Sequence, residues 1–233
     1  MNRLGRTLVA IAIATCPQAL PAAPSAATSQ TVTGIPLDTT WKGSVYAFAR
    51  TKLLHPAWGW THSERDYQLA LQIAAREELK IDRDVLFAAA FLHDVGAIGG
   101  FQREGVDHAV RSAELAGPIL LSVGFPADNV PAVREAILGH MHDKTPGKTS
   151  ESIVLHDADT VDFLGAVGVA RRLAVTGSAT DYDSGIARIR EFADKLPGRV
   201  VTATARQMAR RRAAEMNQFL DQLTRETNNG RTS

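Results

Sequence analysis

The sequence lacks the features that mark a disulfide-stabilised, nucleic-acid-binding or membrane-spanning protein. Its 233 residues include one cysteine, Cys16, so no intramolecular disulfide can form. Lysine and arginine number 26 and aspartate and glutamate 25, and the resulting net charge of +1 does not favour binding to a nucleic-acid polymer. Any metal site in this chain must therefore be built from nitrogen and oxygen ligands.

The composition is that of a globular protein with clustered histidines. Hydrophobic residues make up 45% and charged residues 22%, and the length suits one domain with a proper core. All seven histidines lie between His55 and His156. This clustering calls for a functional explanation.

Residues 1–27 have the order of an export signal. Arg3 and Arg6 are followed by an apolar run over residues 8–15 and a small-residue region over 19–27. The apolar run is too short to span a bilayer, so we expect no transmembrane segment after signal removal. We expect export to the periplasm or the medium. The Thr15-Cys16 junction resembles a lipobox, so lipid anchoring through Cys16 stays open as an alternative.

The rest of the chain predicts one helical domain. Residues 28–40 form an extended arm or linker, residues 41–226 the folded domain, and residues 227–233 a frayed tail. Helical periods recur within the domain, and no segment alternates convincingly as a strand does. The expected fold is an all-α, single-domain orthogonal helical bundle.

Two predicted helices carry histidines at informative places. A capping box of Thr61 and Glu64 places His62 in a first turn, on the face that the helix turns inward. Residues 84–95 are apolar almost all round, which indicates a buried helix that carries His93 and Asp94 in its last turn. A buried polar pair needs partners.

Further helices supply more polar residues. Asp107 caps a helix that Gly117 and Pro118 bend or stop, and His140 lies on the inward stripe of the next helix. One helix is predicted over residues 152–175, with Asp159 near its start. Two more are predicted over residues 184–195 and 202–225.

In order, the inward-facing residues read His62, then His93-Asp94, then Asp159. With the surrounding words Thr-His-Ser-Glu-Arg, Ala-Phe-Leu-His-Asp-Val-Gly and Leu-His-Asp-Ala-Asp-Thr-Val-Asp, this pattern resembles the HD superfamily of metal-dependent phosphohydrolases, which have H…HD…D on an all-α scaffold. Asp66 departs from the family pattern, which usually has an apolar residue there, and we expect it not to disturb the metal.

The resemblance implies that His62, His93, Asp94 and Asp159 bind a divalent metal ion. Two imidazoles and two carboxylates suit Mn²⁺, Zn²⁺, Fe²⁺, Ni²⁺ or Mg²⁺ and leave positions for water and substrate. The metal would lower the pKa of a bound water, which Asp94 would orient.

Three further residues are candidates for the catalytic site. His108 and His140 face inward by helical period and would bind a second metal, bind the leaving group or transfer protons. Arg65, one turn from His62, is the cation best placed to reach a phosphate. His142-Asp143, a second His-Asp pair, falls in a polar loop and is expected to have no metal role.

These residues predict a hydrolase of phosphomonoesters or phosphodiesters, with a small, nucleotide-like substrate. The alternative is an HD-type hydratase of cyanamide or a related nitrile, because the segment over residues 101–109 has some similarity to the cyanamide hydratase branch. A di-iron HD oxygenase is a further, less favoured alternative. Oligomeric state is left open.

Overall fold

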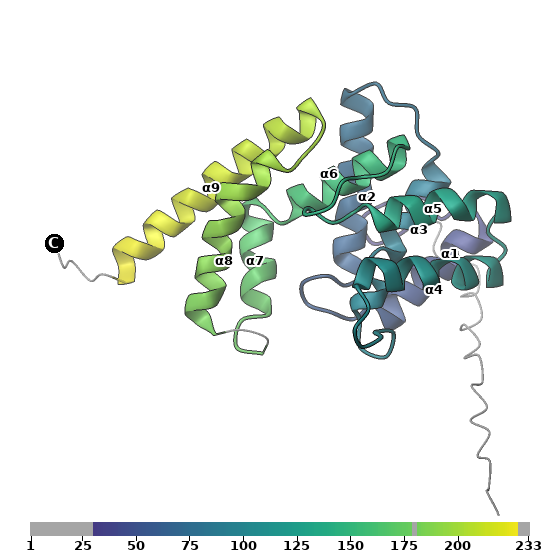
Figure 1. Ribbon diagram of the computed structural model, residues 1–233, viewed down its shortest axis with the longest axis horizontal. Coiled ribbons are helices and arrows are strands. Elements are labelled where there is room, and N and C mark those ends of the chain that lie inside the picture. Colours follow the sequence, from purple (N-terminus) through teal and green to yellow (C-terminus); the bar gives the residue numbers. More distant parts are fainter. Residues whose placement is uncertain (1–29, 179–180, 228–233) are drawn as a thin grey trace, which may run out of the picture.

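The computed structural model describes residues 30–178 and 181–227, and these residues form nine α-helices. The predicted export signal and Cys16 lie outside the described residues. In Figure 1, α1 to α6 occupy one side of the molecule and α7 to α9 the other, with α2 running steeply to α4 and α5. The predicted all-α class is confirmed. The helices are α1 Thr40–Lys52, α2 Trp60–Arg76, α3 Arg83–Leu92, α4 His108–Ser122, α5 Val130–Leu138, α6 Ser150–Asp162, α7 Gly165–Ala174, α8 Tyr182–Lys195 and α9 Ala203–Thr227.

Helix α3 is the centre of the core. Every side chain from Val85 to Leu92 is at most 3% exposed, and α1, α2, α5 and α6 pack around it. The helix ends at Leu92, so His93 and Asp94 follow it at the point where the backbone turns into a short 3₁₀ helix, Val95–Ala97. The two polar residues thus follow the buried apolar helix, just beyond its end and not in its last turn as predicted.

Gly96 brings the beginning of α4 against this turn. A Cβ at Gly96 would lie 2.5 Å from the carbonyl oxygen of His108, which only a glycine permits. The side chain of Asp107 accepts hydrogen bonds from the backbone N–H groups of Ala109 and Val110, which confirms the predicted cap. His108 is therefore held beside Asp94.

The prediction of one helix over residues 152–175 is wrong, because the chain turns between α6 and α7. Gly165 has φ +73°, a left-handed conformation that favours glycine. At Gly168 a Cβ would lie 2.0 Å from the carbonyl oxygen of Phe163, so α7 packs directly on the turn. The turn directs Arg171, in the last turn of α7, back towards α2 and α6.

Three other helix ends differ from the predictions. Helix α2 begins at Trp60 with Gly59 as its N-cap, because the Trp60 N–H donates to Leu53 O, so Thr61 forms no capping box. Helix α4 continues through Pro118 to Ser122. Helix α5 ends at Leu138, so His140 lies beyond it and not on its stripe.

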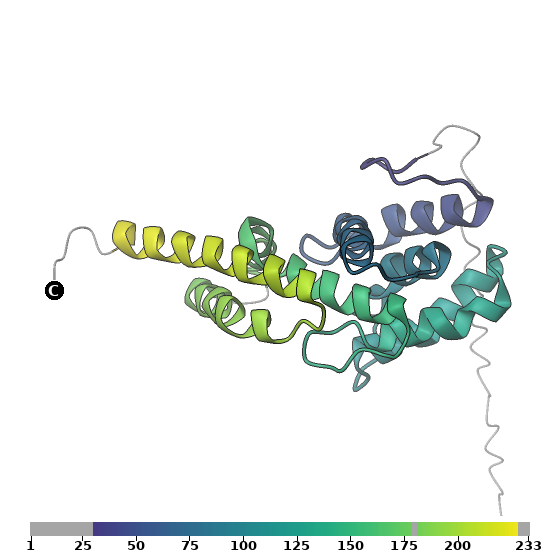
Figure 2. The ribbon, with the colours of Figure 1, turned by 90° about the horizontal axis from the view of Figure 1, so that it is seen from above.

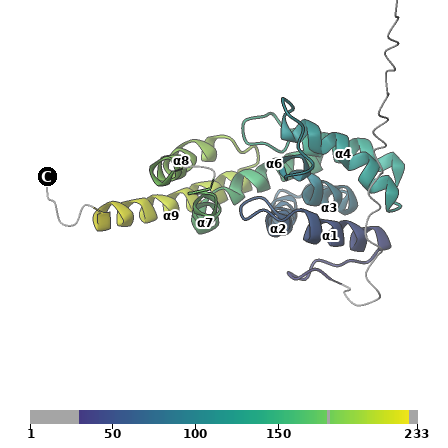
Figure 3. The same ribbon diagram turned by 90° about the horizontal axis from the view of Figure 1, so that it is seen from below.

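The described part of the predicted arm, residues 30–39, packs on the domain. It follows the outside of α1 in Figure 2 and Figure 3. The Val32 N–H donates to the Tyr46 hydroxyl at 3.0 Å, Gln68 Nε2 donates to Thr33 O at 3.2 Å, and Ile35 is buried. None of the helices in the described residues is long and apolar enough to cross a membrane.

Candidate metal centre

The four predicted ligands converge where α2, α3 and α6 meet. His62 Nε2 lies 3.2 Å from His93 Nε2, 3.2 Å from Asp159 Oδ1 and 3.7 Å from Asp94 Oδ2. His93 Nε2 lies 3.4 Å from Asp94 Oδ2. Both imidazoles are at most 1% exposed. Residues up to 97 positions apart in the sequence are thus brought to one buried point by the packing of α2 against α6.

These separations fit a single divalent ion. At metal–donor distances of about 2.1 Å, neighbouring donors lie about 3.0 Å apart in an octahedron and about 3.4 Å apart in a tetrahedron. The measured separations of 3.2 to 3.7 Å are close to these edges. The buried cluster can hold a divalent metal ion.

Asp66, which was not among the predicted ligands, belongs to the same cluster. Its Oδ2 lies 3.0 Å from His62 Nε2 and 3.6 Å from His93 Nε2, and the residue is 0% exposed. His62, Asp66, His93 and Asp159 each offer one donor atom within 4.8 Å of the others. The signal was present in the sequence, since residues 62 and 66 share a helix face.

Asp162, to which the sequence interpretation gave no role, orients His62. Its Oδ2 lies 2.8 Å from His62 Nδ1 and 2.9 Å from Arg171 Nη1, and Arg65 binds the carboxylate through Nε and Nη2, each at 2.9 Å. Because two guanidinium groups help to keep Asp162 ionised, it accepts a hydrogen bond from the Nδ1–H group of His62. The lone pair of His62 Nε2 is then directed at the cluster.

Arg65 and Arg171 both pair with Asp162. Arg65 binds Asp162, and its side chain is 32% exposed, so a contact with substrate stays a prediction. Arg171 is 5% exposed. It donates to Ala57 O at 2.6 Å and its Nη2 lies 3.2 Å from His62 Nε2.

His108 and His140 lie on the other side of Asp94. Asp94 Oδ1 is 3.4 Å from His108 Nε2 and 3.5 Å from His140 Nε2, whereas Asp94 Oδ2 faces His62 and His93. His140 is buried, with Nδ1 bound to Ile137 O at 2.6 Å, and the His108 side chain is 31% exposed. His93, Asp94 and His140 form a second group of converging donors. The catalytic roles of both histidines remain predictions.

The remaining histidines lie outside the two groups. His142 packs its ring edge-on against Phe163 and Phe192, in the loop that was predicted for it. His55 stacks on Trp58 with ring centroids 3.6 Å apart. His156 is buried and contacts Asp157. No described donor group includes any of these three side chains.

Burial and neighbouring charges shift the pKa values of the side chains in the cluster. Burial raises the pKa of Asp66 to about 8. Burial would lower the pKa of His93, but Asp94, Asp66 and Asp159 raise it to about 10. Burial opposes ionisation of Asp159 too, yet His62 lowers its pKa to about 2. The carboxylates thus depend on positive charge inside the cluster, which a metal ion also provides.

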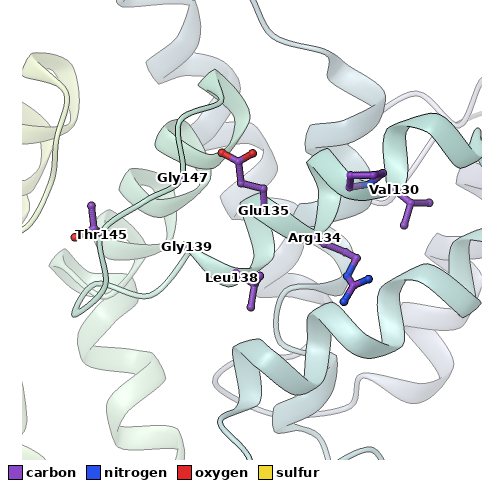
Figure 4. Close-up of a pocket in the computed structure, with 8 residues that line it drawn as sticks. Val130, Arg134, Glu135, Leu138, Gly139, Thr145 and Gly147 are labelled. Carbon is purple, nitrogen blue, oxygen red and sulfur yellow. The ribbon is translucent and has the colours of Figure 1, made fainter.

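A groove and a small cavity lie near the donor cluster, and a larger groove lies away from it. A groove of about 170 Å³ is lined by residues that include Arg188, Lys195 and Arg199, beside His142. A small cavity of about 40 Å³ is lined by Trp58, Phe163 and Arg171, among others. A groove of about 490 Å³ on α5, shown in Figure 4, contains no residue of the donor cluster.

The comparisons with known proteins agree with this geometry. The family model described as HD domain matches residues 59–164. An uncharacterized protein of Clostridium beijerinckii is 26% identical over 78 residues, which are 34% of this chain and 49% of that protein. The chain therefore spans about half the length of the curated relative it matches.

Solved structures share most of the described fold. A predicted HD superfamily hydrolase from an uncultured Thermotogales bacterium is 29% identical, with a TM-score of 0.55 over 78% of this chain and 90% of that chain. A Lactobacillus plantarum protein is 25% identical, with a TM-score of 0.61 over 81% and 97%. Bacillus subtilis YpgQ, solved in complex with ADP, is 23% identical with a TM-score of 0.60 over 79% and 97%, which shows the fold alone.

The family follows from the position of the cluster within the matched segment. All the donors, together with Asp162, lie inside residues 59–164, on or just after helices of the expected all-α scaffold. The similarity to the cyanamide hydratase branch is not among these findings and stays a prediction. With its histidine and aspartate donors gathered inside the matched segment, residues 59–164 of this chain form an HD domain.

Proposed function

We propose that the protein is a metal-dependent phosphohydrolase of small, nucleotide-like phosphoesters. The observation that carries the proposal is the partly open edge of the buried donor cluster. The donors are almost fully buried, but the Asp94 side chain is 12% exposed and its neighbour His108 is 31% exposed. Solvent and a small substrate therefore reach the centre along Asp94 and His108.

The donor set and its surroundings suit phosphoester hydrolysis. His62, His93, Asp94 and Asp159 would hold a divalent ion, which would lower the pKa of a bound water and polarise a phosphoryl oxygen. Asp94 directs one oxygen to the cluster and the other to His108 and His140, so it can accept a hydrogen bond from the attacking water. His108, at the exposed rim, can give a proton to the leaving oxygen.

Cationic residues beside the centre favour a polyanionic substrate. The groove at His142 has three cationic side chains, Arg188, Lys195 and Arg199, against the carboxylates of Asp143 and Glu191. It adjoins the centre through Phe163, whose ring lies 5.7 Å from His142 and 6.4 Å from His62. Binding of ADP by the YpgQ protein of the same fold supports a nucleotide-like substrate. Export, which residues 1–27 predict, would limit the substrates to those met outside the cytoplasm.

The test is a substrate screen on protein of known metal content. Wild type and Asp94→Asn are assayed with Mn²⁺, Fe²⁺ and Zn²⁺ against nucleoside phosphates, a model phosphodiester and cyanamide. We expect phosphate release by wild type and a loss of at least about 100-fold in Asp94→Asn, as for loss of a directly acting group. Glu64→Gln, a buried carboxylate of α2 outside the cluster, is the control.

Two results would replace the proposal. Urea formation from cyanamide, with no phosphoester hydrolysis by fully metallated protein, would identify a hydratase. Two irons per chain with oxygen consumption would identify an oxygenase that uses the second donor group of His93, Asp94 and His140.

A further inference from the structure

We propose that Asp66 is itself a ligand of the metal, so that three carboxylates and two imidazoles hold the ion. Asp66 is 0% exposed, and among the described residues neither of its carboxylate oxygens has a hydrogen-bond partner. Its Oδ2 nevertheless lies 3.0 Å from His62 Nε2 and 3.6 Å from His93 Nε2. An ionised carboxylate is not buried in this way unless a cation balances it.

The imidazoles next to Asp66 cannot be its hydrogen-bond donors when they are neutral. His62 uses its Nδ1 proton for Asp162, and His93 Nδ1 lies 2.9 Å from Ala90 O, a carbonyl that only accepts. Each ring therefore presents the lone pair of Nε2 to the Asp66 carboxylate. Lone pairs that face one another at 3.0 to 3.6 Å attract a cation between them and repel without it.

The position of Asp66 on α2 makes it a natural partner of His62. Residues four apart on a helix lie on the same face, so both side chains project from α2 towards Asp159 on α6. Glu64 shows the contrast. It is also buried, at 1% exposed, but it lies two residues from His62, on another face, and outside the donor group. Burial of an acidic residue on α2 is therefore not sufficient for membership of the cluster.

A fifth protein ligand changes what the centre prefers. With Asp66, the set is two imidazole nitrogens and three carboxylates, which is richer in oxygen than the four predicted ligands. This set favours the binding of hard, six-coordinate ions such as Mn²⁺ and Fe²⁺ over tetrahedral Zn²⁺. Five protein donors would leave fewer open positions for water and a substrate oxygen than four donors do. This inference concerns the metal alone and does not rest on the proposed substrate.

The test measures metal binding by the full chain without any substrate. Asp66→Asn keeps the size of the side chain and one weak oxygen donor, Asp66→Val removes both oxygens, and Glu64→Gln is the matched control on the same helix. We expect the dissociation constant for Mn²⁺, measured by calorimetry, to rise at least tenfold in both Asp66 variants, because loss of even an outer partner of a ligand costs about 10-fold to 100-fold. Glu64→Gln is expected to bind as wild type does.

Two further measurements separate a ligand from a structural residue. In Co²⁺-loaded protein the visible absorption is expected to intensify in Asp66→Val, because fewer donors surround the ion. In chelator, Asp66→Val is expected to unfold at the same temperature as wild type or at a higher one, because an unbalanced buried carboxylate has been removed. A lower unfolding temperature with an unchanged Mn²⁺ constant would overturn the proposal. If Asp66→Val does not fold, the Mn²⁺ constant of the isosteric Asp66→Asn decides.

Discussion

Replacing Asp162 by asparagine is expected to weaken both the fold and the metal centre. Asp162 is 0% exposed and binds three cationic or proton-donating side chains, namely His62, Arg65 and Arg171. The amide of asparagine has one oxygen, so its NH₂ group must face either His62 Nδ1 or a guanidinium. Either arrangement places a donor against a donor.

The size of the effect follows from how deeply each partner is buried. Arg65 is 32% exposed, so solvent screens most of its contribution. Arg171 is 5% exposed and would be left without its charged partner, and breaking a buried pair costs about 3–5 kcal/mol. We therefore expect the free energy of unfolding to fall by about 3 kcal/mol. Metal affinity is expected to fall about 10-fold to 100-fold, or about 1.4–2.7 kcal/mol, because His62 loses its orienting partner.

The assay combines urea unfolding in chelator with Mn²⁺ calorimetry at 25 °C. The matched control is Asp157→Asn, another buried aspartate of α6, which instead accepts hydrogen bonds from the backbone N–H groups of Val201 and Thr202. We expect the control to lose stability and to keep its Mn²⁺ affinity. Wild-type affinity in Asp162→Asn, or an equal loss of affinity in Asp157→Asn, would refute the role given to Asp162.

Three other outcomes test the fold and the centre. Asp107→Ala removes the cap of α4 and should lower the free energy of unfolding by about 1 kcal/mol at pH 7. The hydrogen bonds of the cap outweigh burial and lower the pKa of Asp107 below 3.8, so the stabilisation is complete above pH 3.8 and the difference from wild type disappears as the pH falls further. Gly168→Ala should lose at least about 2 kcal/mol in thermal unfolding, because its Cβ would meet Phe163 O at 2.0 Å, whereas Gly43→Ala in α1, with open space around it, should be neutral or stabilising. Removing the metal with a chelator, from a free concentration of 100 times its dissociation constant, should lower the free energy of unfolding by about 2.7 kcal/mol, and added metal should restore it. An unchanged unfolding temperature would contradict metal binding to the folded cluster.

Local patterns predicted the elements whose cause is local. The apolar run of α3 required a buried helix, and Asp107 capped α4 as its side chain allows. The predicted capping box at Thr61 does not form, because α2 begins earlier, at Trp60. The Trp60 N–H donates to Leu53 O, a contact that depends on how the preceding turn folds. Helix α6 was predicted to continue because its apolar pattern does, but it ends at Asp162. The chain then turns through extended Leu164 and left-handed Gly165, where α7 begins.

Sequence alone determined the all-α class, because helical period is a property of short segments. The candidate donors His62, His93, Asp94 and Asp159 followed from the resemblance of three short segments to the HD superfamily. Only the tertiary structure decided which other residues join them. Asp162 reaches His62 across 100 residues, and Arg171 returns to both because α7 packs back on the turn after α6. Asp66 lay on the predicted inward face, but its part in the cluster became visible only when packing removed water and left its carboxylate facing two imidazole lone pairs.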